Sequence, residues 1–231
     1  MYFFDPTYFL IVGPGMLLAL YATYKVKSTF NRYSQVAIGS GKTGAQEAEE
    51  LLRRNNVRGV RVEPHEGWLS DHYDPSKRVV RLSPDVYGGR SISAVGVAAH
   101  ECGHALQHAQ GYGAMSVRQN LVGAANIGSN FSFIAIIGGY FLHMAGLIWV
   151  GIILFSAVVL FQLVTLPVEF NASSRARMHL VKDGIITAAE EKQVGKVLNA
   201  AAMTYVAALI TSALTLAYYI LRFTGAGRSD D

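Results

Sequence analysis

The sequence predicts a mainly α integral membrane protein that crosses the bilayer four times and carries a small α+β region outside it. Three observations support this prediction. Only 16% of the 231 residues are charged, whereas about a quarter are charged in soluble domains. No Asp, Glu, Lys or Arg occurs within residues 119–168. Two further apolar stretches, residues 3–24 and 200–221, lie near the ends of the chain.

The uncharged stretch 119–168 is long enough for two membrane crossings. At a rise of about 1.5 Å per residue a helix of this length reaches about 75 Å, and the hydrocarbon core is about 30 Å thick. We therefore expect a hairpin with arms near residues 122–142 and 147–166 and a turn at 143–146. The stretch 3–24 lacks the basic start and the cleavage site of a signal peptide, so it is expected to remain as a span.

The basic residues are concentrated outside the apolar stretches. Of the 20 Lys and Arg residues, 13 lie within residues 25–118 and five within 169–199. The positive-inside rule places both of these segments in the cytoplasm. The expected segments are a first span (1–30), a cytoplasmic catalytic region (31–118), a transmembrane hairpin (119–168), cytoplasmic helices (169–199), and a fourth span with a short tail (200–231). The net charge of +4 reflects this bias and requires no nucleic-acid partner.

The polar segments contain recognisable starts and stops. Thr43 with Gln46 predicts a capping box at the start of a helix. Residues 57–63 are expected to be extended, and residues 72–73 and 78–82 to form a hairpin around the turn 74–77. Ser91 or Ser93 can cap a following helix, which is expected to end near Gly111.

Residues 100–104 of that helix read His-Glu-Cys-Gly-His. His100 and His104 lie one turn apart, so both imidazoles can reach one ion, and the Glu101 carboxylate can contact a metal-bound water. This H-E-x-x-H pattern is typical of zinc metalloproteases. Cys102 points away from the two histidines and is expected to fill a small buried space. The alternative is an amphipathic helix with two hydrogen-bonded histidines, which needs no metal.

A catalytic zinc takes three protein ligands and leaves a fourth position open, so the motif requires one more ligand. His108 lies about 12 Å along the helix axis from His100, which is too far for both to bind one ion. Glu169 is the first charged residue after the hairpin, and two crossings return it to the side of His100 and His104. We therefore expect these three residues to bind Zn²⁺. The alternative for Glu169 is an ordinary charge at a helix end.

Several segments carry a family resemblance, namely DHYDP with VVRLSPDVY, AAHECGHALQHA, LPVEFNASSRA and KVLNAAAMTYVAAL. They resemble the membrane neutral zinc metallopeptidase family, the YugP-like proteins of bacteria. The resemblance implies a zinc endopeptidase of the bacterial plasma membrane in which His100, His104 and Glu169 are ligands and Glu101 is catalytic. The family is distantly similar to HtpX-like membrane proteases, which carry Asp four residues after the third ligand. This chain has Ser173 there, so a carboxylate that orients a histidine is missing.

The expected function is therefore a membrane-embedded, zinc-dependent endopeptidase with a zincin-like catalytic region on the cytoplasmic side. Glu101 is expected to take a proton from the attacking water and to pass it to the leaving amine. The substrate is expected to lie along the strand at residues 78–82 by β-augmentation. His72, Tyr73 and Tyr87 are nearby candidates for stabilising the oxyanion, and the sequence favours none of them.

Other functions explain part of the pattern. A catalytically silent zinc protein that serves as a membrane scaffold or adaptor would use the same ligands, but it would not need Glu101. A site-2-type intramembrane protease would need the motif inside a span and a ligating Asp in a later span. A transporter or channel is disfavoured because the hairpin has no charged residue. The expected partners are a protein or peptide substrate and the lipid bilayer, and a membrane-protein partner stays open.

Overall fold

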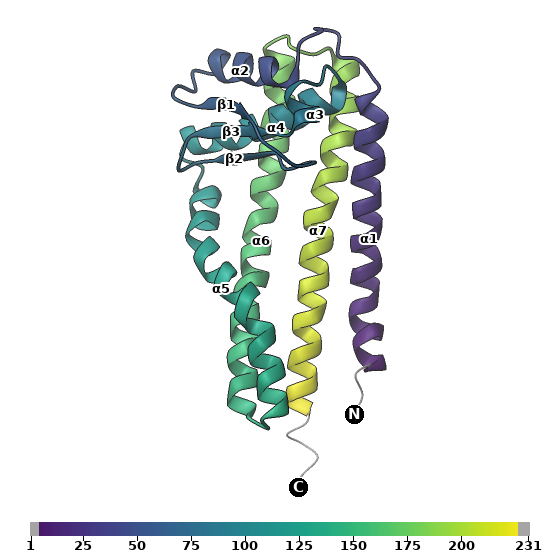
Figure 1. Ribbon diagram of the computed structural model, residues 1–231, viewed down its shortest axis with the longest axis vertical. Coiled ribbons are helices and arrows are strands. Elements are labelled where there is room, and N and C mark those ends of the chain that lie inside the picture. The colour runs from purple at the N-terminus through teal and green to yellow at the C-terminus, as the bar shows by residue number, and fades with distance from the viewer. Residues whose placement is uncertain (1–4, 226–231) are drawn as a thin grey trace. The chain divides into compact units, whose positions relative to one another are not determined.

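The computed structural model describes residues 5–225, which form two compact units (Figure 1). The helical unit comprises the described residues up to Ala22, residues 117–166, and those from Thr204 onward. The strand-containing unit comprises residues 23–116 and 167–203. Phe3 and Phe4, at the start of the first expected span, and Arg228 in the tail lie outside the described residues.

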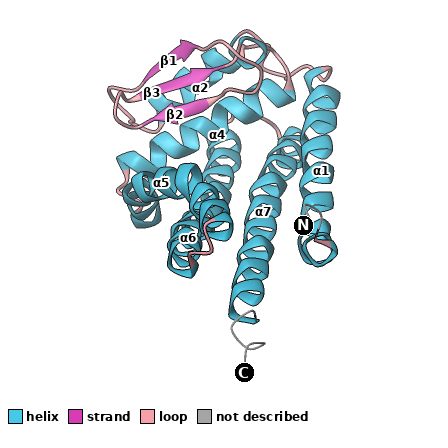
Figure 2. Ribbon diagram, turned by 60° about the horizontal axis from the view of Figure 1, so that its bottom comes forward, coloured by secondary structure: helices cyan, strands magenta, loops and turns pink. Residues whose placement is uncertain are grey.

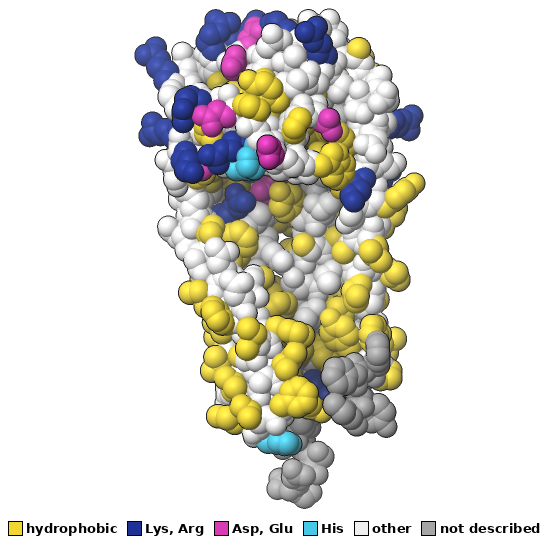
Figure 3. All heavy atoms as spheres, in the orientation of Figure 1, with side chains coloured by type: hydrophobic (Ala, Val, Ile, Leu, Met, Phe, Trp, Pro, Cys, Tyr) yellow, Lys and Arg dark blue, Asp and Glu magenta, His cyan; other side chains and the backbone are white. Residues whose placement is uncertain are grey.

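Within residues 5–225, four helices are long and apolar enough to cross a membrane, as the sequence predicts. They are α1 (Pro6–Ser34), α5 (Gly113–Phe141), α6 (Ala145–Lys182) and α7 (Ala188–Gly225). The helices α5 and α6 form the predicted hairpin, and they pack closely because a Cβ on Gly151 would lie 2.7 Å from the Ser132 carbonyl oxygen. Figure 3 shows apolar side chains along this helical unit, as expected for a surface that faces lipid.

Helix α6 is longer than the sequence indicates. We expected the third span to end near residue 166 and a separate element to follow, but one helix runs through Pro167 to Lys182. A proline removes one backbone hydrogen bond, and long apolar helices tolerate this loss where neighbouring groups compensate. As a result, Glu169 lies on the same continuous helix as the apolar segment before it.

The strand-containing unit combines a three-stranded sheet with short helices (Figure 2). The strands are β1 (Arg61–Pro64), β2 (His72–Asp74) and β3 (Val79–Leu82), and the helices are α2 (Gly44–Arg54), α3 (Pro84–Tyr87) and α4 (Ile92–Ala109). The strands β2 and β3 form the predicted antiparallel hairpin, with Tyr73 opposite Val80. The sequence did not reveal that β1 pairs in parallel with β3, which places β3 in the centre of the sheet.

The predicted helix starts are present in the structure. Thr43 and Gln46 form the capping box of α2. Ser91 caps α4, whereas the Ser93 hydroxyl donates to the Phe30 carbonyl oxygen. The stop after α4 is confirmed because Gly111 has a φ of 63°, which favours glycine.

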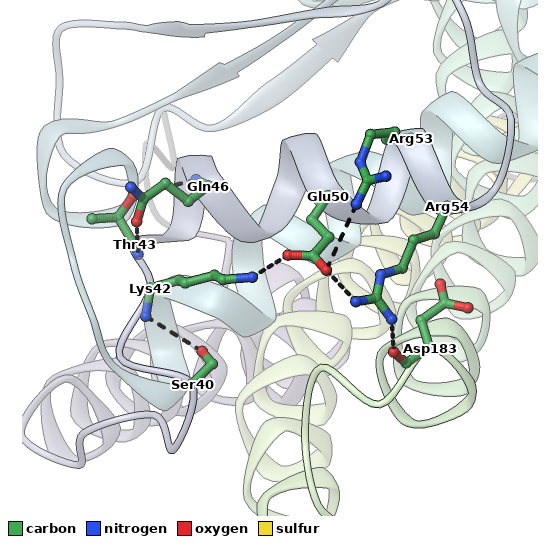
Figure 4. A network of polar contacts seen from close by, with 8 residues as sticks. All are labelled: Ser40, Lys42, Thr43, Gln46, Glu50, Arg53, Arg54 and Asp183. Atoms are coloured by element: carbon green, nitrogen blue, oxygen red, sulfur yellow. Dashed lines mark hydrogen bonds and ion pairs between the residues drawn. The ribbon is translucent and has the colours of Figure 1, made fainter.

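A polar network holds α2 in place (Figure 4). The Glu50 carboxylate pairs with Lys42 and Arg54, and the Arg54 guanidinium also donates to the Asp183 carbonyl oxygen. On its other side α2 packs against α4, where Leu51 is fully buried in the core of the unit. The position of α4 is therefore fixed from the side of α2 as well as from the side of the sheet.

Candidate metal centre

Two helices supply the predicted site residues, all of which lie in the strand-containing unit. His100, Glu101 and His104 lie on α4, and Glu169 lies on α6. The two helices touch at Gly103, where an added Cβ would overlap the Ala172 carbonyl oxygen and would lie 3.0 Å from its carbonyl carbon. The absence of a side chain at Gly103 thus allows α6 to approach the motif closely.

The structure brings His100, His104 and Glu169 together. One ligand atom from each lies within 4.8 Å of the other two. The Glu169 Oε2 atom is 3.2 Å from His100 Nε2 and 3.5 Å from His104 Nε2. Donors bound at about 2.1 Å around a tetrahedral zinc are separated by about 3.4 Å. Two imidazoles and one carboxylate at this spacing fit a zinc ion in the donor types as well as in the separations.

The second nitrogen of each histidine has its own partner. His100 Nδ1 lies 3.0 Å from Ser173 Oγ, and His104 Nδ1 lies 2.9 Å from Gln107 Oε1. These contacts leave both Nε2 atoms directed toward Glu169. The sequence indicated only that an aspartate was missing at Ser173, and we did not single out Gln107 from it. The spacing of Gln107, three residues after His104 on one face of α4, was the signal that could have identified it.

Burial shapes the electrostatics of the motif. Burial raises the pKa of Glu101, against the opposing effect of the nearby imidazoles of His100 and His104. For His104, burial favours the neutral form, but the hydrogen bond to Glu169 and the charge of that carboxylate outweigh it, so its pKa is raised. Burial also raises the pKa of the Cys102 thiol, which stays neutral and lies 3.6 Å from the Ala48 carbonyl oxygen. Cys102 is thus the buried filler that we expected.

Comparison with known proteins supports a peptidase. Residues 8–224 match the model of a family described as "Putative neutral zinc metallopeptidase". The chain belongs to this family. It is also 51% identical over 214 residues to the "Putative membrane protease YugP" of Bacillus subtilis (strain 168), a match that covers 93% of this chain and 95% of that protein. No solved structure matches the chain. Family membership implies zinc, and the donor set of His100, His104 and Glu169 fits that metal.

The remaining histidine of α4 has a different partner. His108 Nδ1 lies 2.8 Å from the Tyr73 hydroxyl, and His108 is not among the three clustered donors. This contact joins α4 to β2 and occupies one of the three oxyanion candidates. Of the others, His72 Nδ1 lies 2.8 Å from the Ser70 carbonyl oxygen, and Tyr87 packs against the core. The geometry singles out none of the three.

The expected substrate strand is wrong. We expected residues 78–82 to receive the substrate, but β3 is hydrogen-bonded on both sides by β1 and β2. A central strand has no unpaired backbone groups with which to bind another chain. The sheet edges belong to β1 and β2, and β2 is the edge strand that contacts α4. The parallel pairing of β1, which the sequence pattern did not reveal, is the reason for the error.

Proposed function

We propose that this chain is a zinc-dependent endopeptidase that hydrolyses proteins at or near the membrane. The observation that carries the proposal is the group of three donors at zinc spacing, with the buried Glu101 next to one of them in the sequence. Membership of a peptidase family and four apolar helices support it. His100, His104 and Glu169 are the proposed ligands, and Glu101 is the proposed catalytic residue.

The roles of the residues follow from their chemistry. When bound, zinc supplies a Lewis acid that polarises the scissile carbonyl and acidifies water. The Glu101 carboxylate accepts the proton of the attacking water and then donates it to the leaving amine. Burial raises the pKa of Glu101 above its usual value, which makes its carboxylate a stronger base for the first of these transfers. His100, His104 and Glu169 would hold the metal next to this carboxylate.

We place the substrate along β2. This strand offers an unpaired edge and contacts α4, which carries the motif. A peptide added to this edge would be held by backbone hydrogen bonds, so it could be recognised with little dependence on its sequence. Two side chains of β2 contact Arg81 of the neighbouring strand β3. The Arg81 Nη1 atom lies 3.4 Å from Asp74 Oδ2 and 3.3 Å from His72 Nε2.

We assign the protein to the bacterial plasma membrane as a multi-pass protein with its active site in the cytoplasm. The support is the distribution of basic residues, which cover the strand-containing unit in Figure 3. In this arrangement residues 31–118 and 169–199 are the cytoplasmic segments. They supply the motif and the third ligand, respectively.

The test uses the full-length protein with Glu101→Gln, and Glu66→Gln as a matched control at an exposed glutamate. Membrane proteomes of cells that express each protein are compared for uncleaved substrates, and zinc is measured in each purified protein. We expect Glu101→Gln to retain stoichiometric zinc and to lose cleavage, and Glu66→Gln to behave as wild type. Cleavage by Glu101→Gln would refute the assigned base, and wild type without zinc would refute the enzyme.

The same experiment separates the competing functions. A zinc-binding scaffold would give the same proteome with wild type and with Glu101→Gln. An intramembrane protease of the site-2 type would carry its motif on a spanning helix. Among the described residues α4 is not one of the apolar helices, so the structure favours a site outside the spans.

A further inference from the structure

The Gln107 side chain lies beside the proposed zinc site and is hydrogen-bonded at both ends of its amide. The following inference rests on the function proposed above. Gln107 is fully buried between α4 and α6. Its Oε1 atom lies 2.9 Å from His104 Nδ1. Its Nε2 atom donates to the Val168 carbonyl oxygen at 2.8 Å and to Asn171 Oδ1 at 3.0 Å. Every hydrogen-bonding atom of the amide thus has a partner.

The chemistry of the partners fixes the orientation of this amide. The Arg175 guanidinium can only donate, and its Nε atom lies 2.6 Å from the Asn171 side chain, so the Asn171 atom that it meets must be oxygen. Gln107 must therefore present its NH₂ group to that oxygen. The Val168 carbonyl oxygen, which can only accept, requires the same orientation independently. The oxygen of Gln107 is left facing His104.

We infer that Gln107 is a positioning residue that fixes the tautomer of His104. An amide oxygen only accepts, so His104 Nδ1 must carry a proton, and when the ring is neutral its lone pair is therefore on Nε2, the atom available to a metal held beside Glu169. Ser173 does not impose such a choice on His100, because a hydroxyl both donates and accepts. The chain from Arg175 through Asn171 and Gln107 thus prepares one of the two histidines for a metal.

Zinc affinity of the purified full-length protein, measured by competition with a chelator of known affinity, tests this inference. We expect Gln107→Met to weaken zinc binding by about 10- to 100-fold, as is usual when a group that orients a metal ligand is removed. Asn171→Asp should retain wild-type affinity, because an aspartate oxygen still accepts from Gln107 and Arg175 and preserves the orientation of the amide. Gln110→Met, which removes another glutamine partner of Arg175 next to the same helix, is the matched control and should have no effect.

The outcomes separate a role in orienting His104 from a merely structural one. Wild-type affinity in Gln107→Met, or equal weakening in Gln107→Met and Asn171→Asp, would overturn the inference. If Gln107→Met does not fold, Asn171→Leu replaces it. The aspartate keeps the acceptor for Gln107 and Arg175, so only the leucine variant should bind zinc more weakly, and equal affinities would contradict us. Absence of zinc from wild type would instead refute the proposed function.

Discussion

Gly103 sets the distance between the motif helix and the third proposed ligand. In Gly103→Ala the new methyl group would lie 3.0 Å from the Ala172 carbonyl carbon, whereas ordinary contacts begin at 3.4 Å. The helices α4 and α6 must therefore separate by at least 0.4 Å, the difference between these two distances. The carbonyl carbon and the carbonyl oxygen of Ala172, which the methyl group would meet, both belong to the backbone, so no side-chain rotation can relieve the overlap. Metal–ligand distances tolerate only about 0.2 Å.

We therefore expect Gly103→Ala to weaken zinc binding by about 10-fold or more, the range found when the support of a ligand is lost. Overpacking costs about 1–3 kcal/mol of stability, partly offset by about 1 kcal/mol from the better helix propensity of alanine. Chelator competition and thermal unfolding of the purified protein measure the two effects.

Gly96→Ala is the matched control on the same helix. Its methyl group would meet the Val194 Cγ1 atom at 3.3 Å, which is only 0.1 Å closer than the 3.4 Å of an ordinary contact. We expect unchanged zinc affinity and equal or slightly higher stability. If Gly103→Ala binds zinc as tightly as Gly96→Ala does, the close contact with Ala172 does not control the metal centre and the reasoning fails.

Three further outcomes are expected. Glu169→Gln should lower zinc affinity by more than the roughly 10- to 100-fold loss caused by removing an orienting group, because it removes the charge of a ligand; equal affinity in the chelator assay would remove Glu169 from the proposed ligand set. Cys102→Ala should leave zinc content and unfolding temperature nearly unchanged, since the thiol only fills space; a large drop in either would show another role. In that cysteine-free background, Ser76→Cys and Met144→Cys each introduce one exposed thiol. An impermeant reagent should label the Ser76→Cys variant only from inside the cell and the Met144→Cys variant only from outside. Labelling of both from one side would overturn the assigned topology.

Local patterns were sufficient to predict most of the elements. The run without charges, residues 119–168, predicted the helical hairpin because its composition and length leave few alternatives. Thr43 and Gly111 marked helix ends correctly, and Ser91, one of the two serines considered, caps α4, because caps depend on neighbouring residues alone. The two crossings of the hairpin also predicted that Glu169 returns to His100, and the two side chains do lie together.

Most of the features that the sequence did not reveal depend on contacts between distant segments. The pairing of β1 with β3 joins Arg61 to Val79, and no local pattern specifies a parallel neighbour. The partners of the histidines include one that is similarly remote, since Ser173 lies 73 residues from His100. The second arm of the hairpin was expected to end near residue 166, and only the structure shows that α6 continues through Pro167 to Lys182.

The strand-containing unit is interrupted in the chain by residues 117–166, which belong to the helical unit. During synthesis the ribosome therefore releases His100 and His104 well before Glu169. A nascent chain has the motif but lacks its third proposed ligand until the intervening hairpin has been synthesised. The order of residues along the polypeptide thus prevents the three clustered donors from coming together before the helical hairpin has been synthesised.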